Sequence, residues 1–261
     1  MGTNLFTGFA LALSGGGARG IVHAGFLQAL DEDNLKPELI SGASMGAIVG
    51  ALYCAGVKPH DMLGAIKFPG FFSLASWIGL HGGLGSLTVL RQQLEHYIPE
   101  DSFESLQIPL IVSVTNLNTA RNELISSGPL YDVVVASSSI PVVFVPVKIG
   151  DQYYVDGGLT MNLPLSCLKK PGRMVVGSNS NHIQEMERAF DSMKQVGERS
   201  MFIAVQNTVQ PQLKDCHLLF DPPQARSFGT FDFEHAADIF EIGYQEGKKL
   251  IPKIKRQIKP E

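Results

Sequence analysis

The residues Ser41-Gly42-Ala43-Ser44-Met45-Gly46 stand between a short apolar run and a long segment that is rich in alanine and glycine. The apolar run, Leu39-Ile40, predicts a strand, and the segment from Ala47 to Gly56 predicts a helix. The stretch between them has the pattern Gly-x-Ser-x-Gly, which is typical of a sharp strand-to-helix turn that carries a nucleophilic serine. It predicts an α/β fold in which Ser44 sits on a strained turn.

The two glycines of this pattern have a steric purpose in such a turn. Gly42 and Gly46 leave out side chains that would collide where the strand meets the helix. The N–H groups at the start of the helix carry partial positive charge, which favours an alkoxide or oxyanion at Ser44. The pattern is short and built from common residues, so its interpretation depends on further motifs.

A second motif follows the first predicted strand, Thr7 to Leu13. Residues 14–20, Ser-Gly-Gly-Gly-Ala-Arg-Gly, lead into a helix predicted from about Ile21 to Leu30. The consecutive glycines Gly15, Gly16 and Gly17 allow several backbone N–H groups to face one point, and the helix adds its dipole there. The loop is therefore predicted to hold an anion or an oxyanion, with Arg19 as its anchor and Gly20 as its last glycine.

The same loop also fits the dinucleotide-binding pattern Gly-x-Gly-x-x-Gly at Gly15, Gly17 and Gly20. A dinucleotide-binding fold needs Asp or Glu at the end of its second strand to hold a ribose. The second predicted strand here ends in residues 40–44, Ile-Ser-Gly-Ala-Ser, without an acid. Nucleotide binding is thus the weaker interpretation.

The third motif is Asp156-Gly157-Gly158. It comes directly after a predicted hairpin, Lys148 to Val155, whose turn is supplied by Gly150-Asp151. The two glycines allow the Asp156 carboxylate to lie against another backbone loop. Taken alone, Asp-Gly-Gly is more often only a turn.

The rest of the chain predicts a three-layer α/β/α architecture with a central, mostly parallel sheet, in one domain over residues 1–261. Apolar patterning predicts strands at 108–115, 123–125, 173–177 and 217–221, an extended stretch at 142–147, and helices at 87–97, 132–138, 185–206 and 232–256. The apolar stretch from Phe68 to Leu80 is either a lid over an acyl-binding groove, a membrane patch or a cover for the core.

The charge and cysteine content exclude several classes of protein. The 261 residues carry a net charge of −4, which argues against a nucleic-acid partner. The three cysteines are far apart and form neither a disulfide framework nor a metal-binding pattern. With no signal peptide and no transmembrane segment evident, we expect a cytoplasmic protein. The basic end of the last helix, Lys248 to Lys259, complements the helix dipole or contacts anionic lipid.

Together the three motifs resemble those of the patatin-like phospholipases, and the likeness runs from the first strand through Pro164. The small single-domain bacterial members are the most similar. The resemblance implies that Ser44 is the nucleophile, that Asp156 is its partner in a Ser-Asp dyad, and that the amides of residues 15–17 form the oxyanion hole, braced by Arg19. It implies a lipid or acyl-ester substrate, peripheral membrane contact, no cofactor and no metal.

Two alternatives stay open at this point. One is a Ser-acid-His triad, since His182, His217 and His235 follow Asp156 in the chain. The other is a change of role on the same fold, either a broad esterase or thioesterase, or a lipid-binding protein without turnover. His23 is expected to pack behind the glycine loop. Burial is expected to raise the pKa of Asp156 and make it a better base.

Overall fold

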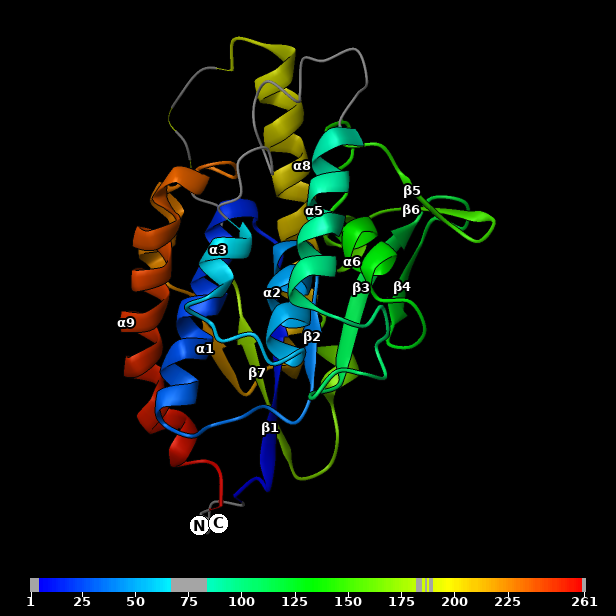
Figure 1. Cartoon of the computed structure of the whole chain (residues 1–261). Helices are drawn as coiled ribbons and strands as arrows, with labels where there is room; N and C mark the ends of the chain where they lie inside the picture. The colour runs from blue at the N-terminus through cyan, green and yellow to red at the C-terminus, as the bar shows by residue number, and fades with distance from the viewer. Residues whose placement is uncertain (1–4, 67–83, 182–184, 186, 188–189, 260–261) are drawn as a thin grey trace.

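The first predicted strand lies in the middle of the sheet. The computed structural model describes residues 5–66, 84–181, 185, 187 and 190–259 (Figure 1). Within them, β1 (Gly8–Leu13) belongs to an eight-stranded sheet with the order β5-β6-β3-β2-β1-β7-β8, in which β4 also pairs with β3. The other strands are β2 (Ile40–Gly42), β3 (Leu110–Asn116), β4 (Arg121–Ile125), β5 (Val147–Ile149), β6 (Gln152–Asp156), β7 (Arg173–Ser178) and β8 (Leu218–Phe220).

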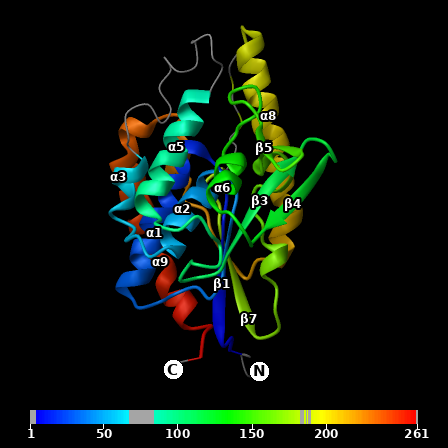
Figure 2. The same cartoon turned by 45° about the vertical axis from the view of Figure 1, so that its right-hand side comes forward.

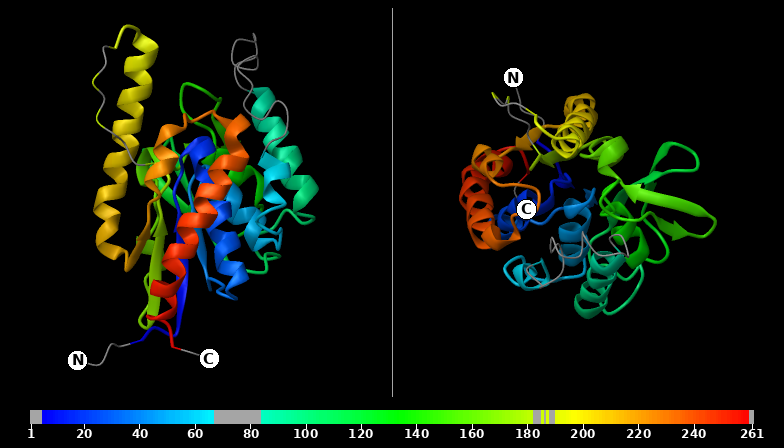
Figure 3. Two further views of the ribbon diagram at one scale, coloured as in Figure 1. Left: turned by 90° about the vertical axis from the view of Figure 1, so that its left-hand side faces the viewer. Right: turned by 90° about the horizontal axis from the view of Figure 1, so that it is seen from above.

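Helices cover both faces of this sheet, so the prediction of three layers is confirmed (Figures 2 and 3). The helices and 3₁₀ turns are η1 (Gly17–Ile21), α1 (Val22–Glu32), α2 (Met45–Cys54), α3 (Met62–Ile66), α5 (Leu84–Tyr97), α6 (Tyr131–Ser137), α7 (Gly158–Met161), η2 (Ser166–Leu168), α8 (Met193–Val209), η3 (Gln210–Asp215), η4 (Pro223–Ser227), η5 (Phe233–His235) and α9 (Ala236–Lys255).

The alternation of side chains along β1 builds two unequal cores. Phe9, Leu11 and Leu13 face the larger cluster, which the buried sides of α1, α2, α5, α6 and α9 complete. Ala10 and Ala12 face a smaller cluster that includes Val209 at the end of α8. The small side chains allow the second helical layer to approach the sheet closely, which brings α8 to the region of the second and third motifs.

The sheet is mostly parallel around β1, and an antiparallel hairpin enters it beside β3. β1 pairs in parallel with β2 and β7, β2 with β3, and β7 with β8, whereas β4 and β6 run antiparallel to β3. β4 occupies one edge of β3 along residues 112–116, so β2 and β6 share the other edge. The end of β2 therefore meets the end of β6 head-on.

Two predicted elements differ from the structure. The helix expected over 185–206 is α8, which begins at Met193 because the Ser192 side chain accepts a hydrogen bond from the Gln195 N–H and caps it. The stretch expected to be extended over 142–147 begins with a turn instead, in which the N–H groups of Val143 and Phe144 both donate to the Ile140 carbonyl. The segment from Phe68 to Leu80 lies outside the described residues.

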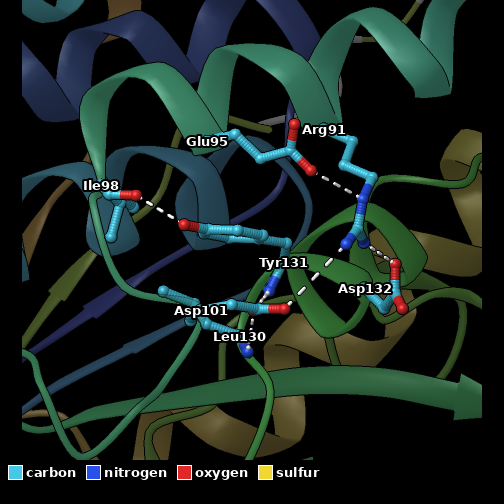
Figure 4. Close-up of polar contacts among 7 residues, drawn as sticks. All are labelled: Arg91, Glu95, Ile98, Asp101, Leu130, Tyr131 and Asp132. Carbon is cyan, nitrogen blue, oxygen red and sulfur yellow. Dashed lines mark hydrogen bonds and ion pairs between the residues drawn. The ribbon is translucent and has the colours of Figure 1, made fainter.

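Polar side chains join α5 to the start of α6 (Figure 4). Asp101 Oδ1 accepts hydrogen bonds from the N–H groups of Leu130 and Tyr131, at 2.7 Å each. Arg91 of α5 pairs with Asp132 of α6 and, at 3.0 Å, with Glu95. The helix α6 is thus fixed at its N-terminal end by a carboxylate, as helix capping requires.

Removal of this cap is expected to cost stability. Asp101→Ala leaves two helix-terminal N–H groups without their acceptor and should lower the free energy of unfolding by about 1–2 kcal/mol. Glu95→Ala breaks an exposed pair with Arg91 and should cost less than about 0.5 kcal/mol. Urea denaturation of both variants measures the difference. Equal losses in the two would show that Asp101 does not act as a cap.

Candidate active site

Ser44 lies at the turn between β2 and α2 in a strained backbone conformation. Its φ is 52° and its ψ is −124°, a region that residues with a side chain rarely adopt. The turn is held in place by a chain of hydrogen bonds. The Ser44 N–H donates to Ser137 Oγ at 2.9 Å, and the Ser137 hydroxyl donates to the Ser113 carbonyl at 2.8 Å. The surrounding structure therefore fixes the serine that the motif singles out.

The two glycines of the turn lie where backbone segments cross. A Cβ on Gly42 would lie 2.6 Å from the carbonyl carbon of Gly46, and one on Gly46 would lie 2.7 Å from the Ser14 oxygen. Real side chains do not reach such distances from backbone atoms. Both glycines thus allow β2, α2 and the end of β1 to meet closely.

Asp156 reaches Ser44 from the opposite direction. Gly42 pairs with Val112 of β3, and Asp156 pairs with Val114, so the residue two positions after Gly42 comes level with Asp156. The Ser44 side chain lies close enough to the Asp156 carboxylate to lower its pKa, and the Gly158 N–H donates to Asp156 Oδ1 at 2.7 Å. The structure thus brings the first and third of these motifs together.

The Asp156 carboxylate is buried, with 5% of the residue exposed. Burial raises its pKa from 3.8 to about 6, although the Ser44 side chain and the hydrogen bond from the Gly158 N–H act in the other direction. The predicted rise of this pKa is confirmed. A carboxylate with such a pKa is ionised at neutral pH and is a stronger base than an exposed aspartate.

The glycine loop presents two of its three amides. The Gly15 N–H donates to the Asn162 side-chain oxygen at 3.1 Å and to the Asn162 backbone carbonyl at 3.3 Å. No acceptor for the Gly16 and Gly17 N–H groups is found in the described part of the chain. The prediction that all three amides are available is therefore corrected, because the Gly15 amide is already bonded.

Arg19 supports this loop from behind. Its Nε donates to the Gly16 carbonyl at 3.4 Å, its Nη2 donates to Asn181 Oδ1 at 2.6 Å, and its guanidinium lies 5.5 Å from the centre of the Phe202 ring. Burial lowers the pKa of Arg19 to about 10 and Asp232 raises it, so the side chain stays charged at neutral pH. The contacts match the anchoring position that the sequence predicts for Arg19.

The remaining glycines of the second and third motifs lie against neighbouring side chains and backbone. A Cβ on Gly20 would lie 2.7 Å from Cβ of Met45, so this glycine allows η1 to pack on α2. A Cβ on Gly157 would meet the Ser113 carbonyl. A Cβ on Gly158 would lie 2.9 Å from Asp156 Oδ1. The turn Asp156-Gly157-Gly158, called the acid turn below, therefore packs against β3 at close range.

His23 holds the start of the glycine loop as a neutral group. Its Nε2 lies 2.9 Å from the Ser14 carbonyl and must donate to it, so its Nδ1 accepts from the Ser178 hydroxyl at 2.7 Å. Complete burial lowers the pKa of His23 to about 4. This confirms that it packs behind the loop.

The histidines offered as a rival base have other partners. His217 Nδ1 accepts from the Val175 N–H at 2.9 Å, and the exposed His235 lies 3.3 Å from Asp238. Neither has a contact with Ser44 or Asp156 among the described contacts. His182 lies outside the described residues. Among the described histidines, neither His217 nor His235 is therefore placed to act as the base.

Sequence reasoning missed two polar residues of this site. Ser137 was not singled out, although the Ser-Ser-Ser-Ile-Pro run at 137–141 is an unusual end for an apolar helix. Asn162 lies four residues beyond the third motif and carries no pattern of its own. Both act across long sequence separations, 93 residues for the bond to Ser44 and 147 for the bond to Gly15.

The described residues contain neither a metal-binding cluster nor a helix that could span a membrane. Their His, Cys, Asp and Glu side chains form no group of three or more that could hold a metal ion. Among the helices of the described chain, none combines the length and apolar character that crossing a membrane requires.

Comparisons with known proteins place the three motifs within one family match. A family model described as patatin-like phospholipase matches residues 11–168, a range that contains all three motifs. A lysophospholipase, nte1, of Emericella nidulans is 27% identical over 280 residues, covering 95% of this chain and 18% of that protein. The corresponding protein of Aspergillus fumigatus is 25% identical over 279 residues, again at 95% and 18% coverage. This chain thus spans less than a fifth of these relatives.

Solved structures show the same fold at low sequence identity. VipD from Legionella pneumophila superposes with a TM-score of 0.56 at 16% identity, over 95% of this chain and 67% of that one. ExoU from Pseudomonas aeruginosa, solved in complex with SpcU, superposes with a TM-score of 0.53 at 14% identity, over 96% of this chain and 53% of ExoU.

Proposed function

Because the chain belongs to the patatin-like phospholipase family, we propose that it is a serine acyl hydrolase that cleaves lipid esters with a dyad of Ser44 and Asp156. The observation that carries the proposal is the strand register, which brings Ser44, just after the end of β2, level with the buried Asp156 carboxylate at the end of β6. The N–H groups of Gly16 and Gly17, which have no acceptor among the described residues, support it, since they follow directly after Gly15, which lies against Ser44.

In the first half of the reaction, the Ser44 hydroxyl attacks the ester carbonyl while Asp156 accepts its proton. The carbonyl oxygen gains negative charge as the carbon becomes tetrahedral. The amides of Gly16 and Gly17, at the start of η1, stabilise that charge without having to reorganise. The protonated Asp156 then gives its proton to the leaving alcohol, and an acyl group remains on Ser44.

In the second half, water takes the place of the alcohol. Asp156 accepts a proton from this water, which attacks the acyl group on Ser44. Collapse of the second tetrahedral species releases the fatty acid and returns the proton to Ser44. Asp156 accepts a proton and gives it back in each half, so one carboxylate serves both halves of the reaction.

A lysophospholipid or diacyl phospholipid is the substrate class that we propose. The relatives from Emericella nidulans and Aspergillus fumigatus are named lysophospholipases, and the part that they share with this chain covers 95% of it. Esters or thioesters of simpler acids are the alternative, because the dyad and the amides act on the acyl carbonyl, which all these substrates have. A lipid-binding protein without turnover is the second alternative.

Membrane contact is proposed at the end of the molecule that holds Ser44. The carboxyl ends of the parallel strands lie at this end, whereas the basic end of α9 lies at the other, beside the chain termini (Figures 1 and 3). There, Lys249 pairs with Glu246 and Lys255 with Asp33. These pairs, together with the helix dipole, account for the basic residues without a lipid.

The experiment that tests the function measures fatty-acid release from a panel of substrates. The panel holds a diacyl phospholipid, a lysophospholipid, a triacylglycerol, an acyl-CoA and a short p-nitrophenyl ester. We expect turnover of the phospholipids to exceed that of the other members. Preference for acyl-CoA or the short ester would replace the phospholipase proposal by the thioesterase or esterase one. No turnover, with vesicle binding and no reaction with a fluorophosphonate, would favour a binding protein.

A further inference from the structure

The side chain of Asn162 is buried in the site, and half of its carboxamide has no partner. Asn162 directly follows α7 and is 1% exposed. Its Oδ1 accepts the Gly15 N–H at 3.1 Å, whereas no acceptor for its Nδ2 is found among the described residues. Buried donors without an acceptor are rare in native proteins, so the group requires an explanation.

The carboxamide oxygen of Asn162 lies beside two glycines that also border the reacting side chains. A Cβ on Gly15 would lie 2.5 Å from Asn162 Oδ1 and 2.9 Å from Cβ of Ser44. A Cβ on Gly158 would lie 2.7 Å from Asn162 Oδ1 and 2.9 Å from Asp156 Oδ1. The position of Asn162 therefore explains why glycine is needed at both places, and it places the carboxamide between the glycine loop and the acid turn.

The backbone of Asn162 is fixed from the other side of the sheet. Its N–H donates to Thr208 Oγ1 of α8 at 3.0 Å, and its carbonyl also accepts the Gly15 N–H, at 3.3 Å. With the backbone and Oδ1 both bonded, the side chain has a single orientation. The Nδ2 group is then a fixed donor, which is the kind of group that stabilises a developing charge.

We propose that Asn162 is a further residue of the active site, whose Oδ1 positions Gly15 and whose Nδ2 donates a hydrogen bond to an oxygen of the bound acyl substrate. The inference rests on the proposed function. It also accounts for the Gly15 amide, which is bonded to Asn162 and so is not available to the substrate. The loop loses one amide to Asn162, and the same carboxamide supplies a donor in return, so the site keeps three donors for the acyl oxygen.

Two substitutions separate the donor from the acceptor. Asn162→Asp keeps an oxygen that accepts from Gly15 and removes the donor, at the price of a second negative charge near Asp156. Asn162→Leu has a similar size, removes both functions and adds no charge. Loss of one such donor typically lowers kcat by about 100-fold or more. We therefore expect about a 100-fold fall of kcat in both variants, with KM changed by less than about threefold.

Reaction with a fluorophosphonate supplies a second readout. The phosphonyl oxygen occupies the place of the carbonyl oxygen, so the labelling rate of Ser44 should fall with kcat in both variants. A purely structural role would instead lower the melting temperature and the fraction of labelled protein, while the folded fraction kept its kcat. Circular dichroism and thermal melts record the folded fraction.

A control matches the aspartate variant. Asn118→Asp places the same change in the exposed turn after β3, where Asn118 Oδ1 accepts the Tyr153 N–H at 2.7 Å. It should keep kcat within about threefold of the parent value, as surface changes usually do.

The outcomes are distinct. If Asn162→Leu keeps kcat within about threefold while only Asn162→Asp loses activity, the charge and not the lost donor is responsible, and the inference is wrong. Should the leucine variant fail to fold, Asn162→Ala takes its place under the same criterion. If the parent protein neither hydrolyses an acyl ester nor reacts with the fluorophosphonate, the proposed function itself fails. Full activity of the parent and of both variants overturns the inference alone.

Discussion

Replacement of Ser44 by alanine should lower kcat on every ester substrate by about five orders of magnitude, as expected for loss of a catalytic nucleophile. Without the hydroxyl no acyl-enzyme forms, and the amides of Gly16 and Gly17 have no tetrahedral intermediate to stabilise. Binding of substrate should persist, because the remaining groups of the site are unchanged. Reaction with a fluorophosphonate should be abolished.

The same change should alter Asp156 in a measurable way. The Ser44 side chain lowers the pKa of this carboxylate, and burial raises it. With the hydroxyl removed, burial acts with less opposition, so the pKa of Asp156 should rise above about 6 in Ser44→Ala. A titration of the carboxyl resonances by NMR in the two proteins measures this shift.

A matched control lies three positions earlier in the chain. The Ser41 hydroxyl is buried in β2 and donates to the Pro164 carbonyl at 2.7 Å, away from the dyad. Ser41→Ala should lose about 1 kcal/mol of stability and keep kcat within about threefold. If Ser44→Ala retained more than about 1% of the parent kcat in contaminant-free protein, the nucleophile would have to be sought elsewhere.

The parts of the fold that the sequence predicts are those decided by local patterns. The strand-turn-helix at Ser44 follows from an apolar run, two glycines and an alanine-rich helix, all within about fifteen neighbouring residues. The β5–β6 hairpin follows from Gly150-Asp151 in the same way. Where a capping residue outweighs the helical pattern, as Ser192 does for α8, the predicted boundary is wrong.

The parts that could not be predicted depend on pairing between distant segments. No local signal indicates that β6 enters antiparallel at the edge of β3 that β2 leaves, although this register brings Asp156 to Ser44. The same holds for the Gly15 amide. Three glycines in a row predict three available donors, and only the contact with Asn162, 147 residues away, removes one of them.

Replacement of Asp156 by asparagine should abolish turnover and at the same time stabilise the fold. The amide cannot accept the Ser44 proton, so kcat should fall by about three to four orders of magnitude. Asparagine has nearly the same shape, and its oxygen still accepts the Gly158 N–H, which the structure shows at 2.7 Å from Asp156 Oδ1. The neutral side chain, however, avoids the free energy of burying a charge.

The gain in stability should depend on pH in a defined direction. The pKa of Asp156 is about 6 in the folded protein against an ordinary 3.8, so the folded state binds more protons than the unfolded state between these values. The free energy of unfolding of the wild type therefore decreases as the pH rises from about 4 to 6, by at most about 3 kcal/mol. Asp156→Asn should be more stable than the wild type by about 1–3 kcal/mol at pH 8 and by much less at pH 4.

Urea denaturation at pH 4 and pH 8 measures this difference, with Asp151→Asn as the control, because Asp151 lies exposed in the turn of the same hairpin. The control should show no gain that depends on pH. In parallel, the rate of ester hydrolysis by the wild type should rise with pH through about 6 and then level off, because the dyad needs the ionised carboxylate. A buried carboxylate that destabilises the fold and is required for turnover explains both curves with one pKa. If Asp156→Asn kept its activity, or if its extra stability were the same at both pH values, Asp156 would not be the buried base of this site.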